Sequence, residues 1–579
     1  MNVTAMINAF EELATLLEID GANAFKVRAF RNATRVLADH SHELENLLQA
    51  NSLTSLQGVG PGVAAKVSEF ATTGTMQELE ELRAKIPAGV LAMTQIPSLG
   101  AKKALAIHRE LGIDSIEKLK AACEAGTLAQ IKGMSAKTCA KILEGIALLD
   151  QFKGRHRLNH GWAIAQPILE KLRAHPAVQR ADVAGSLRRW RETIGDLDFV
   201  VSTKSPREVM DFFVALPGVT SVLGNGDTKA SVILAGKIQA DLRCVSDAEY
   251  PYTLMHFTGS KEHNTKLRAR AKSLGMKLNE YGLFREDTNT RLAAGDEREI
   301  HAHLKLDYMP PETREDHGEI ELAESGKFPA LLTRSSLRGL LHMHTTYSDG
   351  KPSLEDYARW AHSNKIEWMG IADHSQSLAI AGGMKETTVI AQHAEIDALN
   401  RQYARRGVRL LKGVESDILP NGDLDYPDHV LRTFDFIVAS VHSHFTLTEK
   451  EQTARICRAI ENPHTTVLGH MTGRQLLIRD GYRVDQKAVI RCAAENNVAI
   501  EINGNPRRLD MDWRFLRHAL DLGCKLTVGP DAHSIDGLND AEYAVAILRK
   551  GWATKDDVLN CLVVEEFLAF ASARRGGGK

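Results

Sequence analysis

The 579-residue sequence predicts a multidomain protein with α+β and α/β parts. We expect helical N-terminal domains, a mixed domain built on a sheet, and a distorted parallel β/α barrel. Three observations lead to this fold class. Glycine turns recur among helix-like periods near the N-terminus, strand-like alternation begins near residue 155, and strands alternate with helices after residue 337. At about 150 residues per domain, the length fits roughly four domains.

Composition narrows the class of protein. The hydrophobic fraction of 43% and the charged fraction of 25% are ordinary for a soluble globular chain. No apolar run approaches the roughly 20 residues needed to cross a bilayer, and the acidic, amphipathic start lacks the features of a signal peptide. The seven cysteines form no CxxC pair, so neither a disulfide framework nor a thiolate zinc site is indicated. We expect a cytoplasmic protein without a membrane partner. The net charge of −2 does not by itself indicate nucleic acid.

The N-terminal region contains three similar segments, each with an apolar residue, a tight turn and a helix start. They are LQGVGPGVAAKV at 56–67, IPSLGAKKALAIH at 96–108 and IKGMSAKTCAKIL at 131–143. Successive backbone N–H groups at such a turn can bind a phosphate without reading bases. The first copy has Gly58, Gly60 and Gly62, whereas the others keep only Gly100 and Gly133. For these weaker copies, a plain helix cap without a ligand is an open alternative.

The middle of the chain carries a carboxylate pattern. Asp196 and Asp198 lie two residues apart on an expected strand, so their side chains face the same side. Asp241 lies on another expected strand and could complete a three-carboxylate site. Such a site can hold divalent metal ions against a triphosphate, and its hard oxygen ligands suit Mg²⁺. A DxD pair alone more often marks a solvated strand edge, but the preceding Gly185-Ser186 makes nucleotidyl transfer the better interpretation.

The C-terminal region places polar side chains at the ends of its expected strands. They are His342, His344, Asp349, His374, Glu415, His442, His470, Asp531 and His533. In a parallel barrel these strand ends share one rim. A lone histidine there is more often structural, but the whole set of imidazoles and carboxylates suits Zn²⁺, Mn²⁺ or Fe²⁺. The sequence therefore predicts a metal centre that activates water against a phosphoester.

At the middle segments the chain resembles the family X DNA polymerases. GSLRRWRETIGDLDF, QADLRCV and HFTGSKEHNTKLRARA are similar to the palm and thumb of that family, and the match covers about residues 1–310. The resemblance implies that Asp196, Asp198 and Asp241 are catalytic and hold Mg²⁺ or Mn²⁺. It also implies a nucleotide pocket formed by Gly185, Ser186, Arg189, Gly195, Arg243, His256, Phe257, Gly259, Lys261 and Asn264. His256 replaces a tyrosine common in eukaryotic members. Lys261 replaces an acidic residue, and a phosphate contact and a merely solvated side chain are both open interpretations of it.

The N-terminal turns resemble helix-hairpin-helix elements, which implies contacts to DNA from Gly58, Gly60, Gly62, Gly100 and Gly133. Lys66 aligns with the Schiff-base lysine of family members that remove a 5′-deoxyribose phosphate. A plain phosphate contact is the other interpretation of this lysine.

The C-terminal region resembles the PHP domain, the polymerase and histidinol phosphatase superfamily, over about residues 337–575. The resemblance implies three divalent metal ions, expected to be Mn²⁺, Zn²⁺ or Fe²⁺. Its pattern assigns the first ion to His342, His344, Glu415 and Asp531. It assigns the second to Glu415, His442 and His470, and the third to Asp349, His374 and His533.

Together these resemblances imply the following domains: a helical lyase-like DNA-binding domain at 1–90, fingers at 91–153, a palm at 154–250, a thumb at 251–312, a linker at 313–336 and a PHP barrel at 337–579. The order is typical of bacterial family X polymerases. It implies a monomer that fills short gaps in base-excision or break repair, and a metal-dependent 3′–5′ exonuclease or related phosphodiesterase. Gapped or nicked DNA and dNTPs are the expected partners, with other repair proteins as further candidates. The alternatives are a PHP phosphoesterase for small phosphate esters with a non-polymerising, DNA-binding front half, and a pure DNA-binding scaffold.

Overall fold

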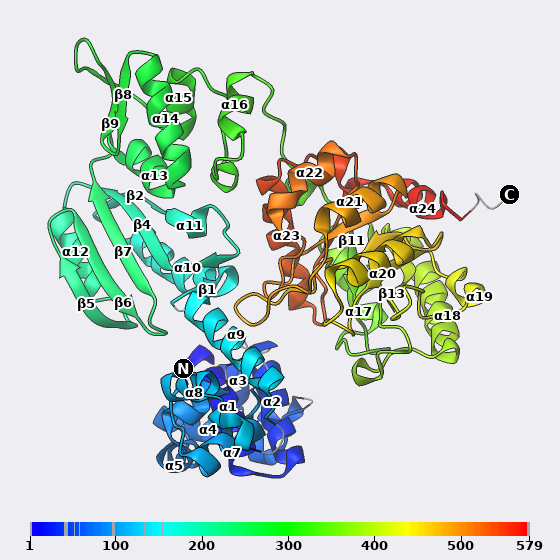
Figure 1. The fold of residues 1–579 in the computed structure, drawn as a ribbon. Coiled ribbons are helices and arrows are strands. Elements are labelled where there is room, and N and C mark those ends of the chain that lie inside the picture. Colours follow the sequence, from blue (N-terminus) through cyan, green and yellow to red (C-terminus); the bar gives the residue numbers. More distant parts are fainter. Residues whose placement is uncertain are drawn as a thin grey trace. The chain divides into compact units, whose positions relative to one another are not determined.

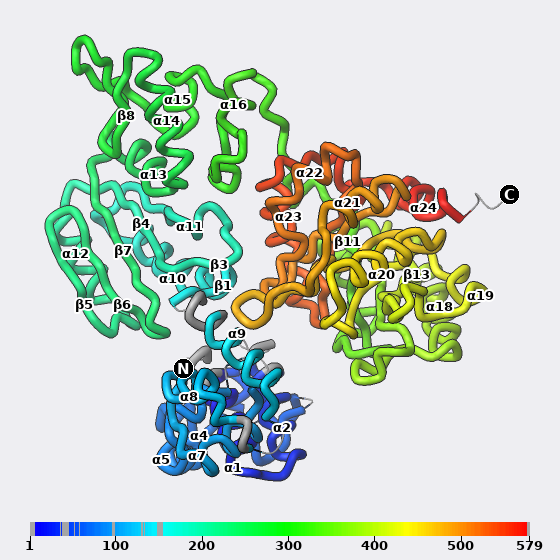
Figure 2. Tube along the Cα trace, in the orientation of Figure 1, coloured from blue at the N-terminus to red at the C-terminus, as the bar shows by residue number. Residues whose placement is uncertain are grey.

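The computed structural model describes residues 3–39, 44–50, 52–56, 58–94, 96, 99–131, 134–152 and 154–575 (Figures 1 and 2). The chain divides into two compact units, Met1–Lys153 and Gly154–Lys579. This division coincides with the place where we expected the fingers to give way to the palm. Within the described ranges, no helix is long and apolar enough to cross a membrane.

The first unit is built from helices. They are α1 (Val3–Asp20), α2 (Ala24–Asp39), α3 (Leu44–Gln49), α4 (Pro61–Thr73), α5 (Gln77–Lys85), α6 (Ala88–Met93), α7 (Ala101–Leu111), α8 (Ile116–Glu124) and α9 (Ala136–Phe152). Their apolar sides share one core, in which Phe10, Leu13 and Val67 are fully buried. Burying such a face stabilises these helices, because most are too short to be stable alone.

The expected turns precede helices in the first unit. Gly60 is the N-cap of α4 and Pro61 occupies its first position, where the missing N–H costs nothing. Gly58 has φ +95°, a backbone conformation that residues other than glycine rarely adopt. Gly100 is the N-cap of α7. The third segment leads into α9, but Gly133 lies outside the described residues.

The second unit begins with a small mixed domain. Its elements are β1 (His156–Arg157), α10 (Leu158–Ala174), β2 (Val178–Val183), α11 (Gly185–Arg188), β3 (Thr193–Ile194), β4 (Asp196–Thr203), α12 (Pro206–Val214), β5 (Val219–Asn225), β6 (Lys229–Leu234) and β7 (Gln239–Val245). The main sheet has the order β2-β4-β7-β6-β5, in which only β4 and β7 pair in parallel. This pairing sets Asp198 directly beside Asp241.

A helical and three-stranded region follows. It contains α13 (Tyr250–Thr258), α14 (Lys261–Ser273), β8 (Met276–Asn279), β9 (Gly282–Arg285), β10 (Arg291–Leu292) and α15 (Glu297–His303). The polar segment 313–336, expected to be a linker, contains α16 (Glu319–Glu324) and the fully buried side chains of Arg314 and Glu319. It is a packed connection rather than a flexible one. Its charges find buried partners, which composition alone could not show: Arg314 pairs with Glu297, and Glu319 with His263.

The rest of the second unit is the predicted parallel barrel (Figure 1). Its strands are β11 (Gly339–Met343), β12 (Trp368–Ile371), β13 (Arg409–Asp417), β14 (Phe436–Ser440), β15 (Val467–Leu468), β16 (Ala499–Asn503) and β17 (Leu526–Gly529), paired in sequence order. The ring is nearly closed by a parallel bridge between Met343 and Ala532.

Helices surround this sheet: α17 (Leu354–Ser363), α18 (Glu386–Tyr403), α19 (Asp428–Leu431), α20 (Glu449–Glu461), α21 (Gln486–Glu495), α22 (Leu516–Asp521), α23 (Ala541–Lys550) and α24 (Val564–Ser572). Most barrel strands are buried along their whole length, as is typical of parallel strands covered on both faces. Strands alternate with helices after residue 337 as expected, and the parallel barrel confirms the predicted fold class.

Candidate active sites in the palm and at the barrel rim

The first candidate site is the carboxylate cluster on β4 and β7. Asp196 and Asp198 alternate with the buried Leu197 and Phe199, so the strand period turns both carboxylates away from the core. Asp241 joins them through the parallel pairing of β4 with β7. The structure therefore brings the three predicted aspartates together.

Mutual repulsion marks this cluster as a cation site. Burial, then the charges of Asp196 and Asp241, raise the pKa of Asp198 to about 7. Partial desolvation by its neighbours and the charge of Asp241 also raise the pKa of Asp196, whose side chain still reaches solvent. Like charges held this close favour protonation, which a bound divalent cation would reverse. The cluster therefore fits Mg²⁺ or Mn²⁺, with oxygen ligands only.

Asp241 has a partner that sequence patterns did not reveal. Lys229 on β6 places Nζ 2.6 Å from Asp241 Oδ2, and Gln239 Nε2 donates to Oδ1 at 3.0 Å. Burial would raise the pKa of Asp241, but hydrogen bonds from Lys229, Gln239 and Ser231 lower it. Lys229 is found only through the antiparallel pairing of β6 with β7, because its own sequence neighbours carry no motif.

Gly185 is held against the cluster. It has φ +60°, and a Cβ added there would lie 2.3 Å from Asp198 Oδ2. Only glycine allows the start of α11 to approach the carboxylate this closely. The neighbouring Ser186 is partly exposed, and Gly195 is exposed with open space around its Cα.

The other predicted nucleotide residues form a connected group at the end of α13. Asn264 Nδ2 donates to the carbonyl of His256 at 2.7 Å, and the His256 and Phe257 rings lie 5.0 Å apart. The Arg243 guanidinium lies 3.9 Å from the centre of the Phe257 ring. The side chain of Lys261 is exposed.

Arg189 contacts the same group from α11. It donates through Nη1 to the carbonyl of Thr258, and this nitrogen lies 3.1 Å from the position of a Cβ on Gly259. The adjacent Arg188 instead forms a buried ion pair with Glu297, with Nη2 2.8 Å from Oε2.

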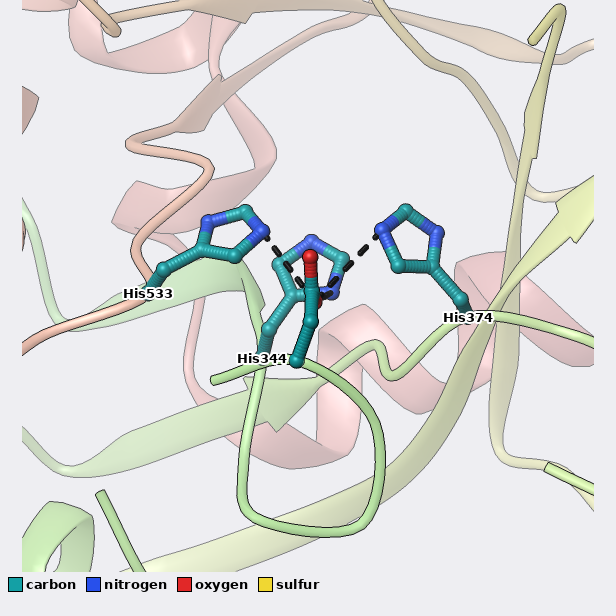
Figure 3. A group of neighbouring side chains, drawn as sticks. His344, His374 and His533 are labelled. Carbon is teal, nitrogen blue, oxygen red and sulfur yellow. Dashed lines mark ion pairs between the residues drawn. The ribbon is translucent and has the colours of Figure 1, made fainter. Parts of the chain in front are cut away.

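The second candidate site lies at the rim of the barrel and collects all nine predicted ligands. Three groups have ligand atoms within 4.8 Å of one another: His344 with Asp349, His374 and His533; His342 with His344 and Glu415; and His374 with Glu415 and His442. Figure 3 shows His344, His374 and His533 turned toward one space. His470 Nε2 lies 2.9 Å from Glu415 Oε1, and Asp531 Oδ1 lies 3.3 Å from His344 Nε2.

The sharing of ligands differs from the pattern implied by the resemblance. His344 lies in the group of Asp349 as well as in that of Glu415, and His374 also approaches Glu415, with Nδ1 2.9 Å from Oε2. Tertiary packing decides this, because each imidazole offers two nitrogens and only the ring orientation selects one.

Buried atoms without hydrogen-bond partners show that this rim fits metal ions. Among the described residues they include His342 Nε2, both ring nitrogens of His344, Asp349 Oδ1 and both oxygens of Glu415. Leaving so many buried polar atoms unsatisfied is costly unless a ligand completes them. Imidazole nitrogens mixed with carboxylates suit Zn²⁺, Mn²⁺ or Fe²⁺.

Burial and neighbouring charges shift the pKa values of the rim residues in opposite directions. Burial and neighbouring imidazoles lower the pKa of His344 to about 3. The carboxylates Asp349 and Asp531 outweigh burial and raise the pKa of His533 to about 9. Glu415 has its pKa held well below the usual range by His342, His442 and His374. One ionised carboxylate therefore stands at the centre of the imidazoles, as a bridging ligand requires.

Two further carboxylates orient the imidazoles and were not predicted. Glu501 accepts a hydrogen bond from His342 Nδ1, and Asp417 lies 2.5 Å from His442 Nδ1. In both rings Nε2 is left facing Glu415, at 3.3 Å. Carboxylates in this position fix the tautomer of a metal-bound histidine. Asp417 lies two residues after Glu415 on β13, so strand alternation could have indicated it.

Backbone strain accompanies two of the rim residues. His342 has φ +66° and Asp531 has φ +53°, both unusual for residues other than glycine. His342 lies within β11 and Asp531 lies just beyond the end of β17. Main-chain hydrogen bonds join the two segments, such as that from Ala532 N to the His342 carbonyl at 3.3 Å. Strain of this kind clusters at functional sites.

The helix-hairpin-helix turn offers open backbone. No atom lies within 4 Å of a Cβ built on Gly60 or Gly62, so a phosphate could approach the start of α4 closely. Lys66, one turn later, places Nζ 2.9 Å from Glu69 Oε2 and 3.9 Å from Glu78 Oε2. The lysine is thus an ion-pair partner in this structure.

Several parts of the chain match models of known protein families. Family models match for a helix-hairpin-helix domain (residues 1–76), a SAM-like helix-hairpin-helix tandem (90–147), the DNA polymerase beta thumb (253–315) and the PHP domain (341–505).

Two relatives illustrate the range of similar proteins. The chain is 37% identical over 572 residues to "DNA polymerase/3'-5' exonuclease PolX" of Bacillus subtilis (strain 168), covering 98% of this chain and 99% of that protein. It is 29% identical over 201 residues to a "Probable phosphatase" of Acetivibrio thermocellus, covering 33% of this chain and 78% of that protein. The first similarity spans nearly the whole of both chains. The chain therefore belongs to the bacterial family X DNA polymerases that carry a C-terminal PHP domain.

Proposed function

We propose that this chain is a DNA-directed DNA polymerase that fills short gaps during DNA repair and also carries a metal-dependent 3′–5′ exonuclease in its PHP barrel. The observation that carries the first activity is the convergence of Asp196, Asp198 and Asp241 beside Gly185. The second activity rests on the nine histidines and carboxylates at the barrel rim.

In the polymerase site, Asp196, Asp198 and Asp241 would hold Mg²⁺ or Mn²⁺. Metal ions bound there would neutralise charge on the triphosphate and lower the pKa of the primer 3′-hydroxyl. We propose that Asp241 helps to take the proton from the primer 3′-hydroxyl: Lys229 and Gln239 lower its pKa, so its carboxylate is ionised and available. Ser186, Arg189 and the backbone at Gly185 and Gly195 would bind the triphosphate.

The nucleotide pocket supports dNTPs as substrates. His256 and Phe257 would face the sugar and base, and Asn264 is held beside them by its hydrogen bond to the His256 carbonyl. The exposed Lys261 could add a phosphate contact, since its side chain forms no ion pair among the described residues. Gapped DNA would be gripped at the turns around Gly60 and Gly100.

In the barrel, the rim residues would hold three divalent metal ions that supply an activated water at neutral pH. Glu501 and Asp417 would keep Nε2 of His342 and His442 directed at the metals. We propose Mn²⁺, Zn²⁺ or Fe²⁺ there, because imidazole ligands outnumber carboxylates.

One reaction tests this proposal. A 5′-phosphorylated gapped duplex is incubated with the protein and Mg²⁺ or Mn²⁺, with and without dNTPs. Extension with dNTPs and 3′-end shortening without them are the expected results. Absence of extension under both metals would contradict the polymerase function.

A second candidate is a phosphoesterase for small phosphate esters, favoured by the similarity to the "Probable phosphatase" of Acetivibrio thermocellus. Hydrolysis of a generic phosphomonoester without any shortening of DNA ends would support it over the exonuclease.

A further inference from the structure

A buried lysine links the barrel to the polymerase site. Lys550 is the last residue of α23, and its side chain is fully buried. A buried ammonium group must be surrounded by acceptors to offset its lost hydration. Lys550 Nζ donates to the carbonyl of Arg189 at 2.7 Å, to the carbonyl of Glu312 at 3.2 Å and to Glu315 Oε1 at 3.1 Å. The Trp513 ring covers the amine, with its centre 4.8 Å away.

Glu315 joins the same lysine to two arginines. Its Oε1 accepts from Arg189 Nε at 3.1 Å, and its Oε2 accepts from Arg191 Nη1 at 3.2 Å. Burial would raise the pKa of Glu315, but Lys550, Arg189 and Arg191 lower it to about 2. The carboxylate is therefore ionised at neutral pH and shared by three cations.

Arg189 is consequently fixed at both ends. Lys550 holds its main-chain carbonyl, Glu315 holds Nε, and the carbonyl of Thr258 holds Nη1. Arginine loses much rotamer entropy when it binds a phosphate from a free state, and fixing it beforehand reduces that loss. The adjacent Arg188 belongs to a different network, in which its guanidinium donates two hydrogen bonds to Glu297 and one to Thr258 Oγ1.

We propose that Lys550 and Glu315 are positioning residues of the polymerase reaction, through which the barrel helix α23 holds Arg189 ready for the triphosphate of the incoming dNTP. This inference rests on the proposed polymerase function and adds to it. It gives the PHP barrel a role in nucleotide affinity that is independent of its own metal centre.

The test uses the full chain and three variants, Lys550→Met, Glu315→Gln and the double variant. Methionine keeps most of the length of lysine and removes the charge, and glutamine keeps the shape of glutamate. KM for dNTP and kcat are measured on gapped DNA, and exonuclease rate and melting temperature are measured in parallel. Each single variant should raise KM for dNTP about tenfold, as expected for one displaced charge-assisted contact, with kcat much less affected.

The double variant should raise KM no further than the single ones, because both residues act through Arg189. The matched control is Lys525→Met. This lysine of the same barrel donates through Nζ to the carbonyl of Asp556 at 2.8 Å, far from Arg189 in the sequence and without any contact to it among the described residues. The KM of the Lys525→Met variant for dNTP should equal that of the unmodified chain.

Two results would overturn the inference. One is an unchanged KM for dNTP in both single variants at a native melting temperature. The other is a parallel loss of polymerase and exonuclease rates with a lowered melting temperature and unchanged KM, which would indicate a purely structural role. Failure of the proposed function is distinguishable, because then the unmodified chain would not extend the primer at all.

Discussion

The palm cluster and the barrel rim solve the problem of holding divalent cations in opposite ways. The palm uses three carboxylates, of which Asp196 is exposed and Asp241 has a side chain 13% exposed. The rim uses six histidines and three carboxylates, and the central carboxylate, Glu415, is 1% exposed. The palm carboxylates are thus more exposed than Glu415, although the outer rim ligands Asp349 and His533 are each 35% exposed.

The difference indicates how each site obtains its metal ions. Hard, exposed oxygens bind Mg²⁺ weakly and suit ions that arrive with the triphosphate. Buried imidazoles with orienting carboxylates form a preorganised cage for resident ions. We therefore expect the rim metals to remain through purification and the palm metals to be lost.

The strongest test that the palm and the rim are separate sites is to remove one palm carboxylate. Asp198→Ala should lower nucleotide incorporation by at least about 10³-fold, since metal clamping supplies several kcal/mol at the transition state. The exonuclease rate and the metal content of the rim should not change. Single-nucleotide extension and end shortening, measured on the same preparation, check both sites. Equal loss of both activities with an intact fold would contradict two separate sites.

The reciprocal change acts on the rim. His344→Ala removes an imidazole that lies in two ligand groups, so we expect the exonuclease rate to fall by at least about 10³-fold. Nucleotide incorporation should be preserved. Metal analysis should find fewer bound ions per chain, and unchanged metal content with full nuclease activity would exclude His344 as a ligand.

A third prediction tests whether the palm site needs the close approach of the Gly185 backbone to Asp198. Gly185→Ala would place Cβ 2.3 Å from Asp198 Oδ2 in a left-handed conformation, so the carboxylate must move. A misplacement of this size should lower incorporation by about 10²-fold. Gly224→Ala on β5 is the control, because a Cβ there meets no atom within 4 Å. Equal rates for the two variants would show that the approach of Gly185 is unimportant.

A fourth prediction concerns the orienting carboxylates of the rim. Glu501→Gln keeps the shape but weakens the acceptor for His342 Nδ1, and should reduce metal affinity by about 10–100-fold. Titration with a chelator measures this directly, without relying on activity. The exposed Glu495→Gln on α21 should retain the affinity of the unmodified chain. Identical chelator curves for both variants would argue against an orienting role.

The smallest expected effect is on stability and lies outside both sites. Burial, reinforced by Arg314, lowers the pKa of the fully buried His301 to about 3. The unfolded chain would bind a proton there below about pH 6.5, whereas the folded chain would not. The stabilising contribution is therefore complete above pH 6.5 and is lost as pH falls toward 3. At about pH 5 the loss is about 2 kcal/mol.

Melting temperatures at about pH 7 and pH 5 test this prediction. His301→Gln should show a smaller fall between the two pH values than the unmodified chain. The exposed His362→Gln should show the same fall as the unmodified chain. If His301→Gln lost as much stability on acidification as the unmodified chain, His301 would not be the source.

Much of the fold and of both sites could be predicted from the sequence because the decisive signals are local. The strand period sets Asp196 and Asp198 on one side, and seven buried strands that each end in polar residues indicate a barrel with a functional rim. The glycine turns at Gly58 and Gly100 likewise precede helices, as expected. The polar composition of 313–336 was misleading, because Arg314 and Glu319 are charged yet fully buried.

Only the tertiary structure decided which residues distant in the chain pair with one another. Lys229 reaches Asp241 through the pairing of strands, Glu501 orients His342 across the barrel, and Lys550 reaches Arg189 from α23. Each is a single charged side chain without a local motif. The sequence by itself predicted which residues come together at the two candidate sites, because strand and turn periods act over a few residues. The structure alone decided which charges hold them in place, because a buried charge is stable only beside partners that folding brings together.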